Sequence, residues 1–466
     1  VITSTNAATG TMYSAFNFTV AATNSPTYFG ASNLPGGLAI NSTSGVISGT
    51  PTNAGTYAVP LVASNQWGTG SQTLTLTINM DNFTKVRTRW SNSLVSNALA
   101  SSSVSSIGSK AFGYWKTNGA ALNTNALFPS NSLWSDLPMN GRDATASGNM
   151  VAAFSRLEKM ALAYVTPGCF VVTNSVTNTL TGNPELATAI INGLDWMVAN
   201  VYVTNAYSTN NQLYGNWFDW EVQGAQNFVD TQTLVYSQLS SNQIAKYAAA
   251  VDNYGPTSWA MSNVKSDFGY FFWGALTGAN TTSVAQVTAL RGVLERNSAK
   301  ISEINASNAV PDVFLPVTDG DGFYEDGSYI FHGNVAYNGH YGYVMLEGVV
   351  TLSALLDGTP WTIVDGNYPY VYNWVTDGFM PFFYRGALMD CVRGRSVGTS
   401  GETGPDVGAE ILGYIQTIAS TASTPADKKA VFNAFVANPN PATGQYHFPN
   451  MDRSEEHTSE LQSPCN

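Results

Sequence analysis

Residues 324 to 343 of this chain read Tyr-Glu-Asp-Gly-Ser-Tyr-Ile-Phe-His-Gly-Asn-Val-Ala-Tyr-Asn-Gly-His-Tyr-Gly-Tyr. Glycines, asparagines and polar aromatic residues dominate this run, which predicts a loop with several turns. The loop contains His332 and Tyr341, two side chains that can transfer protons. Apolar residues at three- and four-residue spacing follow it and predict a helix over residues 343–356.

Three further segments carry aromatic, amide or guanidinium groups suited to binding a polar substrate. Residues 214–221 read Tyr-Gly-Asn-Trp-Phe-Asp-Trp-Glu, residues 277–280 read Thr-Gly-Ala-Asn, and residues 390–396 read Asp-Cys-Val-Arg-Gly-Arg-Ser. Each segment alone is weak evidence of a function. With the loop that runs from Asp326 to Tyr341, four segments occur in one fixed order, which argues against coincidence.

These four segments resemble, in the same order, the catalytic region of polysaccharide lyase family 8, which includes hyaluronate, chondroitin AC and xanthan lyases. The resemblance implies an all-α (α/α) toroid that cleaves an acidic, uronic-acid-containing polysaccharide by β-elimination and leaves a C4=C5 unsaturated uronate. It implies no metal and no other cofactor. The catalytic residues that it implies are Asn280, His332, Tyr341 and Arg395, and the substrate-binding residues are Asn216, Trp217, Phe218 and Arg393.

The implied chemistry explains why these residue types are needed. The C5 proton of a uronic acid is weakly acidic, because its removal adds charge to an existing carboxylate, and Asn280 with His332 nearby would stabilise that charge. Tyrosine, with a pKa of about 10, is a poor base unless its phenolate is stabilised. Arg395 is expected to lower the pKa of Tyr341, which would take the C5 proton and return a proton to the departing oxygen. His332 remains an alternative base, because the choice can depend on the substrate's stereochemistry.

Residues 1–80 are expected to form a separate all-β, immunoglobulin-like sandwich. Glycines punctuate short segments around residues 36–57, and residues 73–78 alternate Thr with Leu or Ile, as a half-buried strand does. The module resembles the immunoglobulin-like modules of large secreted bacterial proteins, where it would serve as a spacer or in adhesion.

From about residue 88 the spacing of apolar residues becomes helical, and residues 81–446 are expected to form the toroid. Helices are predicted over residues 150–165, 185–201, 231–251, 284–301, 343–356, 408–419 and 426–436. Residues 447–453 resemble the start of the family's β-sandwich, so that region is expected to be truncated. Residues 454–466 resemble a translated sequencing adapter and are not expected to belong to the protein.

Composition narrows the class of protein. Only 11% of the 466 residues are charged and the formal net charge is -12, which argues against nucleic acid as a partner. No apolar run approaches the roughly 20 residues that span a bilayer, and we expect a secreted protein. The Asp319-Gly320-Asp321-Gly322 run lacks the later ligands of a calcium loop, and the histidines have no zinc spacing, so no metal site is expected.

One departure from the family and two alternative functions stay open. The family commonly has a second arginine four residues after the position of Arg395, where this chain has Thr399. A glycoside hydrolase on the same toroid would need two opposed carboxylates, and Glu325 and Asp326 are too close together in sequence to flank a bond. A non-catalytic glycan-binding or adhesion protein would use the N-terminal module and the aromatic segment, in which Trp217 and Phe218 could also be core residues.

Overall fold

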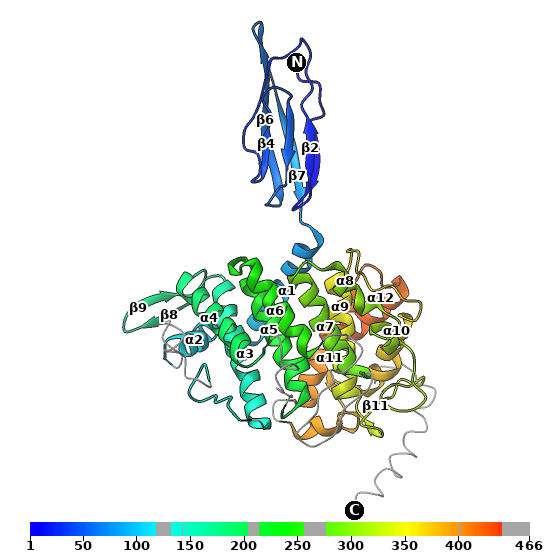
Figure 1. Cartoon of the computed structure of the whole chain (residues 1–466). Helices are drawn as coiled ribbons and strands as arrows, with labels where there is room; N and C mark the ends of the chain where they lie inside the picture. Colours follow the sequence, from blue (N-terminus) through cyan, green and yellow to red (C-terminus); the bar gives the residue numbers. More distant parts are fainter. Residues whose placement is uncertain (118–131, 142, 204–213, 256–275, 400–401, 440–466) are drawn as a thin grey trace, which may run out of the picture. The chain divides into compact units, whose positions relative to one another are not determined.

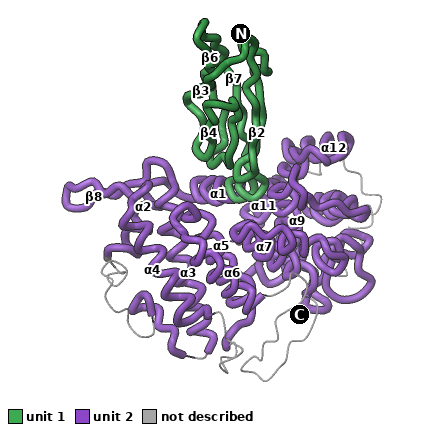
Figure 2. The backbone as a smooth tube through the Cα atoms, turned by 45° about the horizontal axis from the view of Figure 1, so that its top comes forward, with its two compact units in different colours: residues 1–88 green, residues 89–466 purple. Residues whose placement is uncertain are grey.

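The computed structural model of the chain describes residues 1–117, 132–141, 143–203, 214–255, 276–399 and 402–439. The chain divides into two compact units, residues 1–88 and residues 89–466 (Figures 1 and 2). The expected start of a β-sandwich at residues 447–453 and the adapter-like residues 454–466 lie outside the described residues. Within the described residues, no helix combines the length and the apolar character needed to cross a membrane.

Unit 1 is a sandwich of two β-sheets, as expected for an immunoglobulin-like module. One sheet has the strand order β1-β7-β6-β3 and the other has the order β2-β5-β4. All neighbouring strands are antiparallel except β1 and β7, which are parallel. The strands are β1 (Ala7–Thr11), β2 (Phe16–Thr19), β3 (Tyr28–Ala31), β4 (Leu38–Ile40), β5 (Val46–Gly49), β6 (Gly55–Asn65) and β7 (Gly68–Asn79).

The core of unit 1 follows from the alternation in β7. Leu74, Leu76 and Ile78 are buried, whereas the threonines between them face outward or lie half-buried. They pack with residues of the other strands, such as Ile47, into one cluster. This burial confirms the period-two strand predicted over residues 73–78.

The described part of unit 2 is mainly helical, and the boundary between the units falls within α1. The helices are α1 (Asn82–Ser101), α2 (Val104–Phe112), α3 (Ala144–Val165), α4 (Pro184–Asn200), α5 (Gly224–Val235), α6 (Ser241–Tyr254), α7 (Gly278–Leu294), α8 (Ser298–Ser302), α9 (Tyr343–Leu356), α10 (Pro369–Asn373), α11 (Gly404–Ser420) and α12 (Ala426–Ala437). Short strand pairs join them: β8 (Phe170–Thr173) with β9 (Val176–Thr179), β10 (Gly322–Phe323) with β11 (Tyr329–Phe331) and β12 (Val335–Ala336), and β13 (Phe383–Tyr384) with β14 (Ala387–Leu388).

The long helices pack in a regular succession. Helix α3 packs on α5, α5 on α7, α7 on α9 and α9 on α11, while α4 packs on α3 and α6, and α6 packs on α7. The start of α7, at Gly278, and the turn before α9, at Gly342, both lie against Tyr329 of strand β11. This arrangement brings loops that are far apart in the sequence to one end of the helical layer.

Local signals explain where the helical predictions held and where they failed. The prediction over residues 343–356 matches α9, and those over 150–165, 185–201, 408–419 and 426–436 overlap α3, α4, α11 and α12. The single helix predicted over residues 231–251 is wrong, because Ser240 and Gln243 form a capping box that starts α6 separately from α5. Helix α7 begins at Gly278, earlier than predicted, and α8 is separate from it. Helix α1 was missed because its Ser- and Asn-rich sequence shows little apolar periodicity. Helix α2 was missed although Val104, Ile107 and Ala111 recur at helical spacing, because it is only nine residues long.

Candidate active site

The loop that carries His332 and Tyr341 is a small three-stranded sheet, β10-β11-β12, followed by the π-helical turn Asn338–Gly342 (η8) and helix α9. His332 is exposed at the turn between β11 and β12 and has a φ of 53°, an uncommon conformation for a residue with a side chain. Asn338 holds the loop together from inside. Its Oδ1 accepts a hydrogen bond from the Tyr329 N–H at 3.0 Å, and its Nδ2 donates to the carbonyl oxygens of Gly327 and Gly378 at 2.9 and 2.8 Å.

The phenol ring of Tyr341 lies in a cage of other rings. Phe331 stacks on it with ring centroids 4.1 Å apart, and His332 meets it edge-on with centroids 5.3 Å apart. Tyr337 and His340 contact it from 5.3 and 4.8 Å. The structure therefore places His332 and Tyr341 side by side, although nine residues separate them in the sequence.

Arg395 reaches the hydroxyl group of Tyr341 from a 3-10 turn, Gly394–Gly398 (η12). A guanidinium nitrogen of Arg395, Nη2, donates a hydrogen bond to the Tyr341 hydroxyl oxygen at 2.7 Å. Burial raises the pKa of Tyr341 above its usual value, and the positive charge of Arg395 opposes that rise. The direction of the Arg395 effect is as predicted, but the net pKa is raised, because desolvation of the phenolate outweighs the nearby cation.

Arg393 occupies a different environment from Arg395. Its side chain is buried, and its guanidinium group donates to Asp390 and to the carbonyl oxygens of Ser396 and Glu402. Such a side chain fixes the turn that carries Arg395. This geometry argues against the predicted direct contact of Arg393 with a substrate.

Asn280 lies half-buried in the first turn of α7, and the hairpin holds this turn in place. The N–H of Ala279 donates to the Tyr329 hydroxyl oxygen at 3.3 Å. Asp321 joins the two segments from the other side. Its carboxylate accepts a hydrogen bond from the Thr277 hydroxyl group at 3.4 Å and another from the Gly333 N–H at 3.2 Å. The segment of Asn280 and the turn of His332 thus share one anchoring carboxylate.

The aromatic segment approaches the same helix. Asn216 is exposed, and Trp217 and Phe218 are half-buried, with ring centroids 5.9 Å apart. Both rings pack against a small cluster of Val222, Leu276 and Val284, of which Val284 belongs to α7. The pair is thus partly core and partly exposed, and each ring keeps some surface for a ligand.

Sequence reasoning missed three residues that shape this site. Asn338 and Asp321 hold the loop, and His340 contacts the ring of Tyr341. Among the described residues, His340 Nδ1 is buried without a hydrogen-bond partner, and burial lowers the pKa of this histidine. Asn and Asp residues in a turn-rich loop usually signal the turn itself, so the sequence held no sign of their longer-range contacts.

The comparisons with known proteins agree with the resemblance. The sequence model of polysaccharide lyase family 8, N-terminal alpha-helical domain, matches residues 90–438, and an Ig domain model matches residues 1–79. A hyaluronate lyase of Thermasporomyces composti is 35% identical over 271 residues, which are 58% of this chain and 30% of that protein. A xanthan lyase of Bacillus sp. (strain GL1) is 30% identical over 305 residues, 64% of this chain and 30% of that protein.

Solved structures also resemble the chain. The Paenibacillus xanthan lyase matches with a TM-score of 0.63 and 30% identity, covering 77% of this chain and 31% of that one. The Streptomyces coelicolor A3 chondroitin AC lyase in complex with chondroitin sulphate matches with a TM-score of 0.60 and 28% identity, covering 76% of this chain and 44% of that one. The chain spans about 30% of the length of the two curated relatives. With three quarters of its residues inside the family's helical domain, the chain belongs to polysaccharide lyase family 8.

Proposed function

We propose that the protein to which this chain belongs cleaves a uronic-acid-containing polysaccharide, such as hyaluronan, chondroitin or a xanthan-like glycan, by β-elimination. The observation that carries the proposal is the hydrogen bond from Arg395 to the Tyr341 hydroxyl group, beside His332. Such polymers lie outside the cell, so the proposal includes secretion. It also includes closure of the successive helices of unit 2 into an α/α toroid.

Tyr341 is the base in this proposal. Its phenolate oxygen takes the C5 proton, the C–H electron pair forms the C4=C5 double bond, and the C4–O4 bond breaks with its electron pair on the leaving oxygen. The Tyr341 hydroxyl group then gives its proton to that oxygen, so that Tyr341 is again a phenolate. Arg395 stabilises the phenolate before the C5 proton is taken and again after the proton has been given to the leaving oxygen, because a cation within hydrogen-bond distance favours the charged form.

The substrate carboxylate needs positive or hydrogen-bonding groups while charge builds up on it. In the proposal Asn280 and His332 supply them. The N-terminus of α7 supports this role, since the side chain of its N-cap residue Thr277 makes no capping hydrogen bond and the helix dipole favours an anion there. Trp217 and Phe218 offer partly exposed rings on which an adjoining sugar could stack.

The test uses the parent protein, extended beyond Arg453, with hyaluronan, chondroitin and xanthan as substrates. Ultraviolet absorbance of the unsaturated product should appear with the wild type and fall at least ~100-fold in Tyr341→Phe, since positioned acid–base groups contribute about that much. Tyr384→Phe is the matched control, because Tyr384 is an exposed tyrosine of β13 outside the ring cage. New reducing ends without absorbance would mean hydrolysis, and glycan binding without either product would favour an adhesion protein.

A further inference from the structure

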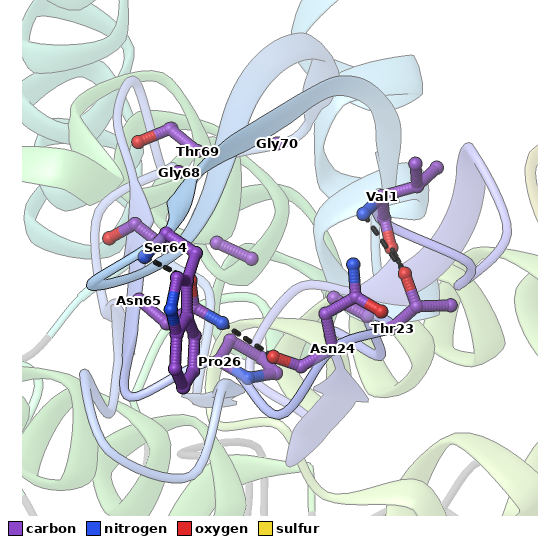
Figure 3. A pocket seen from close by; sticks show the side chains of 12 residues that line it. Val1, Thr23, Asn24, Pro26, Ser64, Asn65, Gly68, Thr69 and Gly70 are labelled. Carbon is purple, nitrogen blue, oxygen red and sulfur yellow. Dashed lines mark hydrogen bonds between the residues drawn. The ribbon is translucent and has the colours of Figure 1, made fainter.

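A pocket of about 370 Å³ opens in unit 1, and none of the residues that line it is assigned to the elimination reaction. The turn between β6 and β7 and the loop before β3 contribute to its walls, and Figure 3 shows Asn24 and Pro26 of the loop next to Asn65. Its size falls within the range of small-ligand sites, which is about 300–1,000 Å³.

The largest side chain at this pocket is Trp67, which lies in the β6–β7 turn and is 80% exposed. An indole usually stabilises a fold through the large apolar area that it buries. The turn instead holds it outward. The Trp67 N–H donates to Asn65 Oδ1 at 2.9 Å, and Asn65 Nδ2 donates to the carbonyl oxygen of Asn24 (Figure 3).

The loop before β3 has unusual backbone conformations. Asn24 and Ser25 have φ values of 65° and 47°, so two successive residues with side chains occupy the left-handed region. Conformations of this kind cost about 1–3 kcal/mol each and collect at sites that hold a ligand. The bond from Asn65 to Asn24 keeps this loop at a fixed place beside the turn.

The chemistry of the lining selects one class of ligand. Within the described part of unit 1, no residue that lines the pocket has a charged side chain, and amide and hydroxyl groups occur in Asn24, Ser64 and Thr69. The one charged group at the lining is the ammonium group of Val1, which donates a hydrogen bond to the Thr23 hydroxyl oxygen at 3.1 Å. A carboxylate or sulfate would find no lysine, arginine or histidine side chain there, and the ammonium group of Val1 already donates to Thr23. An uncharged sugar ring presents hydroxyl groups to amides and hydroxyls, and its C–H face to the electron-rich face of an indole.

We infer that unit 1 binds an uncharged pyranose residue of a glycan at Trp67. The site is independent of the proposed lyase activity and has a different preference, because it would take a neutral sugar while the catalytic site takes a uronate. It would hold the protein on a polymer while unit 2 acts on an acidic segment.

Isothermal titration calorimetry on the whole chain tests this inference. The probes are cellohexaose, mannohexaose and N-acetylchitohexaose, with a hyaluronan hexasaccharide as the anionic comparison. At least one uncharged probe should bind saturably, and Trp67→Ala should weaken that binding about tenfold, while Trp67→Phe should keep part of it. Tyr28→Ala is the matched control, because Tyr28 is a 51% exposed aromatic residue of the same unit that does not line the pocket.

Thermal unfolding of each variant checks that unit 1 remains folded, which is expected because the Trp67 side chain is exposed. Tyr341→Phe should bind the uncharged probe as the wild type does, which separates this site from the catalytic one. Three results would overturn the inference: no saturable binding of any uncharged probe, unchanged binding in Trp67→Ala, or a loss of self-association in Trp67→Ala without any sugar binding.

Discussion

Tyr341 is subject to two opposing influences, and their balance sets its use as a base. Burial raises its pKa, whereas Arg395 lowers it. A base with a raised pKa is stronger once it is deprotonated, but a smaller fraction of it is deprotonated at neutral pH. A protein with this arrangement should therefore become more active as the pH rises towards the pKa of Tyr341.

Replacing Arg395 with Gln should move that pH dependence to higher pH. The substitution removes the cation that lowers the pKa of Tyr341, so the pKa rises further and less phenolate is present. Each pKa unit means tenfold less phenolate, and we expect kcat/KM at pH 7 to fall ~10-fold or more. A pH profile of the parent protein checks this, with Arg385→Gln as the control because Arg385 is an exposed arginine in another turn. An unchanged profile would contradict the role of Arg395.

Two substitutions of Asp321 separate the effect of its negative charge from the effect of its hydrogen bonds to Thr277 and Gly333. Asp321→Ala removes both hydrogen-bond acceptors that hold Thr277 and Gly333, so kcat/KM should fall ~10-fold or more through misplacement of Asn280 and His332. Asp321→Asn keeps an acceptor and removes the negative charge that raises the pKa of Tyr341, so its pH profile should move to lower pH. Asp319→Asn, an exposed neighbour, should change neither quantity. A pH profile of Asp321→Asn that equals the wild-type profile would exclude the charge effect.

At the scale of elements, the turn η12 packs closely against the loop that carries Tyr337, and Gly394 is the point of contact. Gly394 has a φ of 52°, and a Cβ atom there would overlap the ring of Tyr337. Gly394→Ala should displace η12 and break the contact of Arg395 with Tyr341, lowering kcat/KM ~10-fold or more. Gly398→Ala lies in the same turn with no atom within 4 Å of the added carbon, and it should keep full activity. Initial rates of the two variants, together with their melting temperatures, test this; equal rates would contradict it.

Helix α3 carries a carboxyl group that makes the stability of unit 2 depend on pH. Burial raises the pKa of Glu158 to about 7 from 4.5. The folded state keeps this proton to a higher pH than the unfolded state, so stability is lost as the pH rises from about 4.5 to about 7. Glu158→Gln should remove about 2 kcal/mol of this loss, because a pKa unit is worth ~1.4 kcal/mol and partial exposure screens some of it.

Denaturant unfolding of Glu158→Gln and wild type at pH 5 and pH 8 measures that difference. The variant should gain stability relative to wild type at pH 8 and not at pH 5. Glu185→Gln provides the control, because Glu185 is an exposed glutamate in the first turn of α4. The same difference at both pH values would show that Glu158 does not titrate as described.

The sequence predicted those elements whose contacts join residues close together in the chain, and it did not predict contacts between distant residues. The strand of Leu74, Leu76 and Ile78 and the helix over residues 343–356 were predicted because their apolar spacing is local. The four candidate catalytic residues came from a resemblance, and the structure places His332, Tyr341 and Arg395 together. The burial of Arg393 could not be foreseen, because its partners depend on how the turn folds back on itself.

At the scale of the whole molecule, the two units have separate hydrophobic cores and should unfold separately. The core of unit 1 consists only of residues from its own strands and loops. We expect two thermal transitions in calorimetry. Leu74→Ala should destabilise unit 1 by ~2–5 kcal/mol and move one transition, whereas Leu290→Ala in α7 should move the other. A single transition that moves in both variants would show that the units unfold as one.

The parallel pairing of β1 with β7 has a mechanical consequence. The two strands align over five residue pairs, from Ala7 opposite Thr75 to Thr11 opposite Asn79. A pull between the two ends of unit 1 would drag these strands past each other in opposite directions. The backbone hydrogen bonds between the two strands would then be loaded in shear and would have to break together. Bonds loaded in this way resist a pulling force better than bonds that break one at a time. The force that a domain withstands depends on its rate of unfolding. A module with this strand arrangement can remain folded under the mechanical force that flowing liquid exerts between a bound polymer and a neighbouring domain.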